Sequence, residues 1–554
     1  MSVATAGWLQ AGLLVLALAV SYRPLGDYMA HILTSPKHWR AEKFLYRLMG
    51  VDADADQTWP TYVRSVMAIS VIGVLLLYVI LRIQDHLMMA LGMPAMQANL
   101  AYNTAASFVT NTNWQNYSGE NTLGYTAQFA GLAVQNFVSA AVGICLAATL
   151  IRGFVRRQTD QVGNFWVDLT RLNLRLLLPF AFLLAIIFVA SGLPQELSGS
   201  LHTINTVTGG QQTLYTGATG SQEAIKLLGT NGGGIYNANS AHPFENPSGW
   251  TNWLSIYTLL VISFSLPRTF GRMVGSHRQG YAILSVMAIL WAASASIITW
   301  MEAHSWGGAL AVAKGAMEGK EVRFGIPGSG LFSASTTLTS TGAVNNMHDS
   351  LTPFGGGMAL FDMMMGEVAP GGTGSGLYGI LILAIVTVFV AGLMVGRTPE
   401  YLGKKIRPAE MKYAALYILA TPAVALIFTG IAMATPTARN SIANQGPHGL
   451  TEVLYAFTSM ANNNGSAFAG LNGNTQFWNV AGGIAMLLGR FLPMIFVAAL
   501  AGSLAKQRHT PASAGTLETH KPLFVGLLLG VVLIVVGLTY FPALALGPFA
   551  EGLK

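Results

Sequence analysis

Four stretches rich in Thr, Ser, Asn and Gly recur along the chain. They read SFVTNTNWQNYSGEN from Ser107, IKLLGTNGGGIYNANSAHPFENP from Ile225, TTLTSTGAVNNMHDS from Thr336 and LYAFTSMANNNGSAFAGL from Leu454. Each opens with a mildly apolar run, long enough for about two or three helical turns. The central positions Asn113, Gly232, Gly342 and Gly465 are 119, 110 and 123 residues apart. This spacing indicates four copies of one structural unit.

The residue types in these stretches favour cation coordination by neutral oxygens. Glycine adopts unusual backbone angles and lets carbonyl groups crowd together. Four such loops around one axis would present rings of carbonyl oxygens and nearby hydroxyls to a dehydrated ion. Carboxylates are scarce, which suits a monovalent ion better than Ca²⁺ or Mg²⁺. For a single loop, an ordinary polar turn would be the better interpretation; four matched loops favour an ion filter.

The composition shows what must hold these loops. Only 10% of the 554 residues are charged and 52% are hydrophobic, whereas a soluble domain carries about 25% charged residues. Ten segments have the length and apolarity of membrane-spanning helices. They are Val3–Val20, Tyr62–Leu81, Phe129–Leu150, Leu172–Ser191, Trp253–Phe270, Ala282–Met301, Leu377–Gly396, Met411–Ala434, Val480–Leu504 and Leu523–Phe541. The single cysteine, Cys145, excludes a disulfide framework and an all-cysteine metal site.

We therefore predict an all-α polytopic membrane protein, in which four helix–pore-loop–helix repeats surround a central pore. Two further helices, residues 1–21 and 522–542, lie outside the repeats, and residues 22–60 form a cytoplasmic loop. The predicted repeats are 61–151, 171–272, 281–397 and 411–505, with pore loops near 107–117, 223–240, 333–349 and 452–468. Irregular backbone at membrane depth needs such a protein-lined or watery setting.

The basic residues predict the orientation in the membrane. Of 30 Lys and Arg, 22 fall in alternate loops, at 23–64, 152–175, 268–278, 397–412 and 506–521. Seven lie in the opposite loops: Arg82, Lys226, Lys314, Lys320, Arg323, Arg439 and Lys554. By the positive-inside rule the first set is cytoplasmic, so both termini face outward. These charges account for topology and give no support for nucleic-acid binding.

Several motifs of energy-coupling and catalytic proteins are missing. The sequence has no GxxxxGK[ST], no DKTGT phosphorylation motif and no HExxH. GSGLYG at 374–379 matches GxGxxG but opens a predicted spanning helix without a preceding strand, which indicates helix packing or a flexible entry. The longest predicted cytoplasmic stretch, Ser21–Gln57, is too short for a nucleotide-binding domain. We expect no catalytic activity from this chain alone, so active transport would need a partner.

Four longer motifs resemble a known family. TNGGGIYNANSAHPFENP (230–247), GLYGILIL (376–383), GRTPEYLGKKI (396–406) and ANNNGSAFAGL (461–471) are similar to the potassium-translocating A subunit of the bacterial Kdp potassium-transporting P-type ATPase. The likeness extends from PLGDYMA at Pro24 to PALALGPFAE near the C-terminus. This family resembles the Trk/Ktr/HKT potassium transporters, which share the fourfold helix–pore-loop–helix plan.

The resemblance implies a function and a set of partners. The chain would take K⁺ from outside across the bacterial plasma (inner) membrane, embedded in its lipid. A separate P-type ATPase catalytic subunit would use ATP and Mg²⁺, and small accessory membrane subunits would complete the complex. Two alternatives stay open: a free-standing passive channel or symporter of the Trk/Ktr kind, and a membrane-embedded transferase or hydrolase, for which the outward loops offer few acid/base groups.

The resemblance also assigns a K⁺ filter position by position. Its residues are Asn111, Thr112 and Asn113; Thr230, Asn231 and Gly232; Ser340, Thr341 and Gly342; and Asn463, Asn464 and Gly465. Because Asn113 stands where the wider superfamily prefers glycine, we expect different backbone geometry in one quarter of the ring. Gln115 either tunes affinity at the outer mouth or makes an interfacial hydrogen bond.

Other charged residues have two interpretations each. Arg490, inside a predicted span, costs at least about 2.5–3.5 kcal/mol to insert and so needs a cavity or a partner. It is either a positive charge below the filter or a structural salt bridge or snorkelling side chain. GRTPEYLGKKI either docks a pump subunit or is a plain basic loop. Five carboxylates either attract cations electrostatically or are solvated loop groups, and we expect the second: Asp85, Glu302, Asp349, Asp362 and Glu367.

Overall fold

Ten helices in the described part of the chain are long and apolar enough to cross a membrane. The computed structural model describes residues 3–198, 201–304, 315–394, 396, 399–511 and 516–553. Lys314, Arg397 and Lys554, which entered the charge pattern, lie outside the described residues. Each of the ten predicted spans coincides with one of these helices, as expected for runs of about 20 apolar residues.

The spanning helices are continuous or contain one short π-helical segment. They are α1 (Val3–Thr34), α3 (Trp59–Arg82), α5 (Val134–Val155, preceded by a π-helical Ala127–Ala133), α6 and α7 (Phe165–Arg171 and Leu178–Ala190, joined by a π-helical Leu172–Leu177), α9 (Gly249–Met273), α10 (His277–Ala303), α14 (Ser375–Met394), α15 (Pro408–Ala434), α18 (Gln476–Ala505) and α19 (Pro522–Leu544), which continues through a π-helical Ala545–Phe549 into α20 (Ala550–Gly552).

Four shorter helices precede the four polar stretches. They are α4 (Ala98–Val109), α8 (Thr219–Leu228), α12 (Gly325–Leu338) and α17 (Gly446–Asn462). With 12, 10, 14 and 17 residues they are too short to cross a bilayer. Each lies in sequence between two spanning helices, as the predicted repeats require. The remaining α-helices among the described residues are α2 (Arg40–Met49), α13 (Pro353–Met364) and α16 (Pro436–Arg439).

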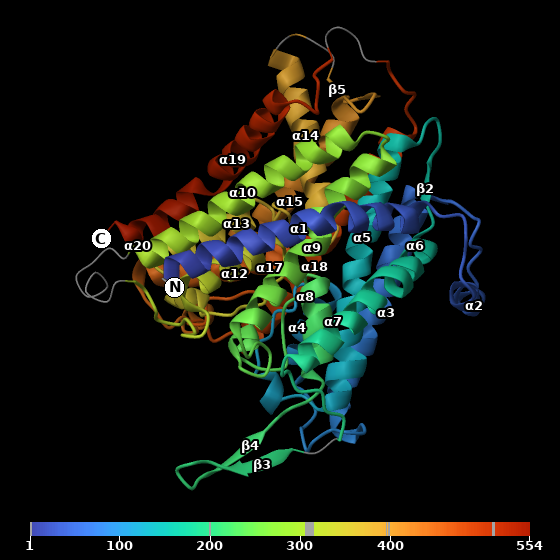
Figure 1. Ribbon diagram of the computed structural model, residues 1–554. Coiled ribbons are helices and arrows are strands. Elements are labelled where there is room, and N and C mark those ends of the chain that lie inside the picture. The colour runs from blue at the N-terminus through green and yellow to red at the C-terminus, as the bar shows by residue number, and fades with distance from the viewer. Residues whose placement is uncertain are drawn as a thin grey trace.

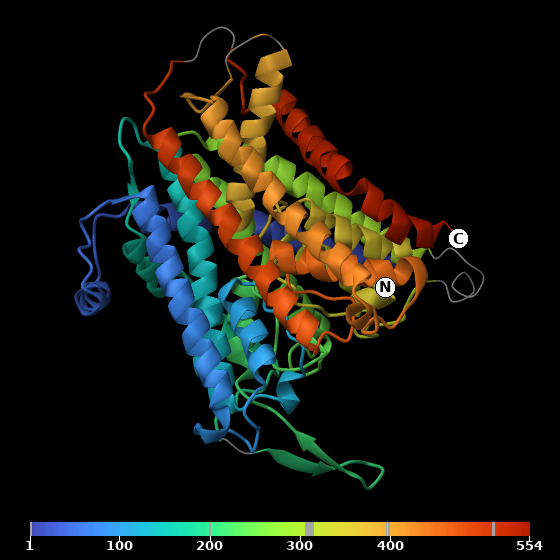
Figure 2. The same cartoon turned by 180° about the vertical axis from the view of Figure 1, so that it is seen from behind.

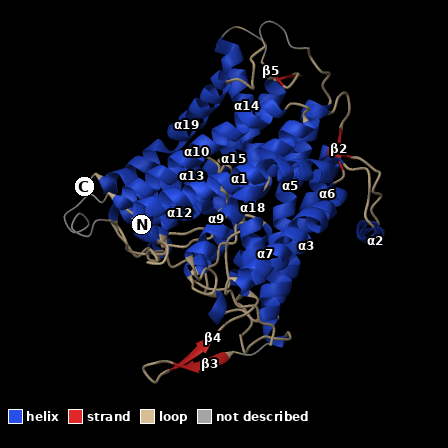
Figure 3. Cartoon of the chain, viewed as in Figure 1, coloured by secondary structure: helices blue, strands red, loops and turns tan. Residues whose placement is uncertain are grey.

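Strands play a minor part and lie at the periphery (Figure 3). Three two-stranded antiparallel pairs occur among the described residues: β1 (Gln57–Thr58) with β2 (Gln161–Gly163), β3 (His202–Asn205) with β4 (Gln211–Leu214), and β5 (Glu400–Tyr401) with β6 (Lys404–Lys405). β2 and β5 lie at one end of the helix bundle. The β3–β4 hairpin and both chain ends lie away from that end in both views (Figures 1 and 2).

Helix burial separates the core of the bundle from its periphery. α5 and α9 are almost wholly buried, whereas α1, α3 and α19 bury little of their surface. The exposed residues of the outer helices are large and apolar, for example Trp8 and Val20 on α1 and Leu538 on α19. Such surfaces are stable against lipid chains, where a helix satisfies its own backbone groups. The first and last helices therefore lie at the periphery of the bundle, as α3 does.

One boundary and one additional helix differ from the sequence prediction. α1 continues to Thr34, well beyond residue 21, because Leu25, Met29 and Ile32 are apolar and bury themselves in the core. The third repeat also contains an additional helix, α13, ahead of α14. The connection at 365–374 is rich in glycine, and Gly366 and Gly371 have φ angles of 77° and 82°, which helices exclude.

Candidate functional site

The four short helices all end in the same hydrogen-bonded turn. In each loop one main-chain N–H donates to the carbonyl five residues earlier, at the end of the helix. The pairs are Thr112 to Ser107 (2.9 Å), Asn231 to Lys226 (2.8 Å), Thr341 to Thr336 (3.3 Å) and Asn464 to Ser459 (2.8 Å). Such a bond closes the C-terminus of a helix when the following residues turn left-handed. The C-terminal ends of these helices carry partial negative charge, which favours a cation beside them.

The backbone after each helix repeats as well. The first filter residues Asn111, Thr230, Ser340 and Asn463 have φ of 67°, 48°, 53° and 60°. Two residues later, Asn113, Gly232, Gly342 and Gly465 have φ of 57°, 79°, 72° and 99°. The expectation that Asn113 changes the backbone of its quarter was wrong in this respect. Asparagine is among the few non-glycine residues that adopt left-handed angles readily, so its φ of 57° lies in the same left-handed region as the 72–99° of the three glycines.

Three glycines make room for the carbonyl of the neighbouring loop. A Cβ placed on Gly232 would lie 1.7 Å from the carbonyl oxygen of Thr341. The corresponding distances are 2.2 Å from Gly342 to the oxygen of Asn464 and 1.9 Å from Gly465 to that of Thr112. The second loop thus contacts the third, the third the fourth, and the fourth the first. Gly233 closes the ring, because its Cβ position lies 3.2 Å from the carbonyl oxygen of Asn113.

Four equivalent carbonyls in this ring have no hydrogen-bond donor. They belong to Thr112, Asn231, Thr341 and Asn464, residues without exposed surface. Among the described residues no N–H or O–H donates to these oxygens. A buried carbonyl without a partner costs free energy, and native proteins rarely leave one so. Four together, one from each loop, have the chemistry of a dehydrated cation site.

The filter side chains brace the ring from outside. The Asn111 amide donates to the Thr230 carbonyl (2.7 Å), which joins the first loop to the second. The Asn464 amide donates to the Thr336 carbonyl (3.0 Å), which joins the fourth to the third. The hydroxyls of Thr112 and Thr341 pair with neighbouring threonines, both at 2.7 Å. These amides and hydroxyls are used in the scaffold, which leaves the main-chain oxygens for an ion, together with the unpartnered Oδ1 atoms of Asn113 and Asn231.

Gln115 joins the first two loops beyond the filter. Its side-chain oxygen accepts a hydrogen bond from the Gly234 N–H at 2.8 Å. The interfacial hydrogen bond predicted as one alternative is therefore present. Its amide nitrogen is buried and has no partner among the described residues, which leaves a donor at this position.

A cluster of buried charges supports the second loop. Lys226, at the last turn of α8, forms ion pairs with Glu223 (2.6 Å) and Glu245, and none of the three is exposed by more than a few per cent. Glu245 in turn accepts hydrogen bonds from the N–H groups of Ile235 (3.0 Å) and Tyr236 (3.2 Å), just after the filter. In the sequence Lys226 is interpreted only as a loop charge; Glu223 lies three residues earlier on α8, but Glu245 comes from the loop after the filter and could not be recognised as a partner.

Arg490 lies in a cavity on one side of the filter. The cavity has a volume of about 80 Å³, and Ser340 and Asn463 of the filter share its wall with Arg490. The guanidinium donates to the Ser139 carbonyl of α5 (3.1 Å), and no carboxylate of the described chain lies within ion-pair distance. Because Arg490 is almost fully buried, it does not snorkel to the surface. The snorkelling and salt-bridge interpretations therefore do not fit the described residues, and a positive charge below the filter stays a prediction.

The same cavity also reaches α19, one of the peripheral helices. Its far wall is made by α19, with Val532, Val536 and Tyr540. Its near wall includes Gly366, in the connection between α13 and α14. This connection touches two filter loops: the Ser340 hydroxyl donates to Glu367, and the Thr373 N–H donates to the Thr230 hydroxyl at 2.8 Å.

Three of the five carboxylates expected in solvated loops are buried. Glu302, Asp362 and Glu367 have at most 1% of their surface exposed, so that expectation was wrong for them. Glu302 pairs with Lys320 (2.7 Å), and Asp362 accepts hydrogen bonds from Ser294 (2.6 Å) and Thr337 (2.9 Å). The sequence carried one signal of this burial, the many glycines around Glu367. The hydroxyl partners come from distant helices and could not be recognised.

The basic loop at 396–406 is packed against the chain in part. Lys404 is buried, and its ammonium donates to the carbonyls of Arg156 (2.6 Å) and Gln507 (3.2 Å). Burial and the nearby Arg157 lower the pKa of Lys404 to about 8. Lys405 beside it is exposed. One of the two paired lysines therefore serves the fold and is not free for a partner.

Comparison with known proteins agrees with this architecture. The family profile described as "Potassium-transporting ATPase A subunit" matches residues 12–553. The chain belongs to this family. Two relatives named potassium-transporting ATPase potassium-binding subunit, from Streptomyces avermitilis and Mycobacterium avium, are each 59% identical over the full length of both chains.

A solved structure shares the fold of this A subunit family member. The crystal structure of the potassium transporter TrkH from Vibrio parahaemolyticus aligns with a TM-score of 0.54, covering 86% of this chain and 97% of that one. At 14% identity this likeness concerns the fold alone. It agrees with the predicted polytopic helical architecture and with the structural relation between the A subunit family and the Trk-type transporters.

Proposed function

We propose that this chain is the K⁺-selective binding and translocation subunit of an ATP-driven potassium uptake complex. The four unpartnered carbonyls of Thr112, Asn231, Thr341 and Asn464 carry the proposal. K⁺ is the cargo, and oxygens fixed in a ring replace its hydration shell. The names of the full-length relatives agree with a potassium-binding role. The twelve filter residues hold or shape this ring, and Gln115 adjusts its entrance.

The sides of the membrane are assigned from charge. Two of the three described strand pairs, β1–β2 and β5–β6, belong to the basic loops. β2 and β5 lie at one end of the bundle (Figure 1). By the positive-inside rule we assign that end to the cytoplasm of a bacterial plasma membrane. Both chain ends then face outward, and the short helices enter from outside. K⁺ reaches the filter from that side.

Below the filter, the path turns sideways. The cavity that begins at Ser340 and Asn463 leads toward α19, and Arg490 stands in its wall. A fixed positive charge opposes straight passage of a cation through this chain. We therefore assign the handover of K⁺ to a neighbouring P-type ATPase subunit, which would lie beyond α19.

The energy for transport belongs to that partner. This chain has no phosphorylation or nucleotide-binding motif, so ATP and Mg²⁺ act only through the catalytic subunit. Small accessory membrane subunits complete the proposed complex. The alternative, a free-standing Trk-like channel or symporter, is supported by the shared fold but not by the family match along the chain.

One experiment separates these functions. The tagged chain is purified from a membrane in which the native operon is expressed, and ATP hydrolysis is measured with and without K⁺. The proposal expects a P-type ATPase to co-purify and its hydrolysis to depend on K⁺. A chain that purifies alone and conducts K⁺ passively in liposomes would establish the channel function instead.

A further inference from the structure

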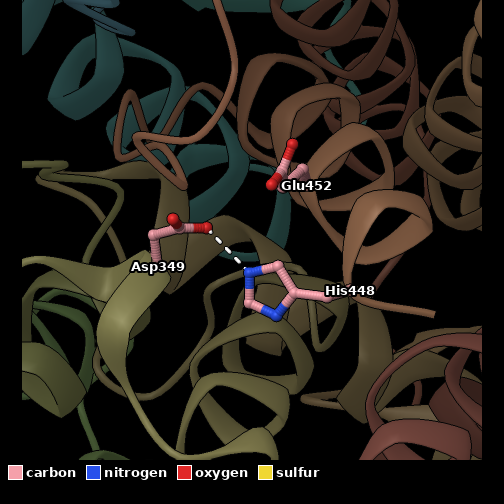
Figure 4. A group of neighbouring side chains, drawn as sticks. All are labelled: Asp349, His448 and Glu452. Carbon is pink, nitrogen blue, oxygen red and sulfur yellow. Dashed lines mark hydrogen bonds and ion pairs between the residues drawn. The ribbon is translucent and has the colours of Figure 1, made fainter. Parts of the chain in front are cut away.

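A histidine and two carboxylates meet away from the filter, at the start of the fourth short helix. Asp349 lies in the turn that follows the third filter loop, whereas His448 and Glu452 are one turn apart on α17. One ligand atom from each lies within 4.8 Å of the other two. Figure 4 shows the three side chains turned toward one shared space.

The distances suit two ligands of one metal ion. The Asp349 Oδ1 lies 3.0 Å from the His448 Nε2. Two donor atoms at about 2.0–2.2 Å from one tetrahedral ion, as Zn²⁺ prefers, are about 3.3–3.6 Å apart, so a bound ion would separate these two atoms by a few tenths of an ångström. Both residues remain partly accessible to solvent, so an ion can enter.

Glu452 supplies an independent indication. The residue is fully buried, and its Oε1 accepts a hydrogen bond from the Asn444 amide at 2.6 Å. Its Oε2 has no partner among the described residues. A buried ionised carboxylate oxygen without a donor is costly, and the cost is relieved by protonation or by a bound cation. Gly470, whose Cβ position lies close to both Glu452 and Asp349, keeps the space between them open.

A fourth residue orients the histidine. The Nδ1 of His448 lies 2.9 Å from a carboxylate oxygen of Glu551, in the C-terminal helix α20. Metal-bound histidines commonly donate their second N–H to a carboxylate, which fixes the ring and strengthens it as a ligand. Glu551 has this position, with the Nε2 turned to Asp349.

We propose that Asp349, His448 and Glu452 bind a divalent transition-metal ion of the Zn²⁺ type, with water in the remaining position. The imidazole ligand favours such ions over Ca²⁺ and Mg²⁺, which prefer oxygen-only shells. Binding would join the loop after the third filter segment to α17 of the fourth repeat. Through Glu551 it would also hold the C-terminal helix at this position.

A proton competes with the metal. Without metal, hydrogen bonds to Asp349 and Glu551 raise the pKa of His448 to about 10, so an ion must displace a proton from Nε2. The simplest rival arrangement is thus a protonated His448 between two carboxylates, with no metal.

The test is Zn²⁺ titration of the purified full complex after chelation, followed by calorimetry and thermal unfolding. We expect one Zn²⁺ per chain and a Tm that rises to a plateau. His448→Gln and Glu452→Gln should each weaken binding at least about tenfold, and Glu551→Gln by about 10- to 100-fold. His86→Gln is the matched control, because His86 has a single, exposed carboxylate partner at 3.0 Å. It should leave Zn²⁺ binding unchanged.

Two results would overturn the site: no saturable binding at millimolar Zn²⁺, or equal binding by the wild-type complex and His448→Gln. The first would leave the protonated-histidine arrangement. Because the readout is metal binding and not K⁺-dependent hydrolysis, failure of this inference leaves the proposed potassium function unaffected.

Discussion

Replacing Gly232 by alanine adds one carbon at the closest contact between two filter loops. The new Cβ would lie 1.7 Å from the Thr341 carbonyl oxygen, although real Cβ atoms essentially never approach a neighbour closer than 3.0 Å. The carbonyl must therefore retreat by at least about 1.3 Å. Because the neighbour is main chain, it cannot rotate away as a flexible side chain would. The Thr341 oxygen is one of the four carbonyls assigned to the ion.

The expected loss follows from the interaction that is broken. A hydrogen bond to a charged group contributes about 1.5–3 kcal/mol, which we take as the scale for one carbonyl on K⁺. At about 1.4 kcal/mol per tenfold change, K⁺ affinity should fall about 10- to 100-fold. Gly232→Asp should lose at least as much, because it adds a larger side chain at the same point.

The assay is the K⁺ dependence of ATP hydrolysis by the purified complex, with Na⁺ as competitor. Gly275→Ala is the matched control: Gly275 has a similar φ of 74°, but its Cβ position meets nothing within 4 Å. It shares the backbone strain without the collision and should keep wild-type affinity. If Gly232→Ala assembles normally and retains wild-type affinity and selectivity, the carbonyl-ring model is refuted.

Substitutions at three further positions test other parts of the site. Asn113→Gly should preserve K⁺ affinity, whereas Asn113→Val should weaken it about tenfold in the same assay, because a β-branched residue resists a φ of 57°. Equal K⁺ affinity of the two variants would show that this backbone angle is unimportant. Arg490→Gln should raise passive K⁺ flux in liposomes on the order of tenfold with unchanged filter affinity, because the cavity loses its positive charge. An unchanged flux would contradict a role of Arg490 in opposing K⁺ leakage. Lys226→Met should destabilise the chain by about 3–5 kcal/mol in unfolding experiments, since Glu223 and Glu245 remain buried without a cation. An unchanged free energy of unfolding would mean that Glu223 and Glu245 are already uncharged in the folded chain.

A fourth measurement concerns pH. The folded-state pKa of Lys404 is about 8, below its ordinary value of 10.5, so the folded chain binds this proton more weakly than the unfolded chain does. Stability should therefore increase as pH rises from about 8 to 10.5, relative to Lys404→Met, which has no proton to lose. The difference in Tm between the two proteins, followed over this range, checks the sign.

Much of the filter is recognisable in the amino-acid sequence. Spans of about 20 apolar residues are local properties, and so are the Thr-, Asn- and Gly-rich turns between them. Pattern and resemblance therefore locate the four anchor residues Asn113, Gly232, Gly342 and Gly465. The backbone of Asn113 was misjudged, because a residue's φ depends on the hydrogen bonds around it as well as on its type. Here the turn at the end of α4 imposes a left-handed φ on asparagine, as the equivalent turns do on glycine.

Other features exist only in the folded chain. The sequence by itself determined a ten-helix membrane protein with four polar re-entrant loops, because apolarity, charge and glycine content act over short stretches. Only the tertiary structure decided that Thr112, Asn231, Thr341 and Asn464 leave their carbonyls unpartnered in one ring. It likewise decided that Glu367 is buried beside Ser340. Such pairings join residues from distant segments, and their burial depends on how helices pack, so no local pattern can specify them.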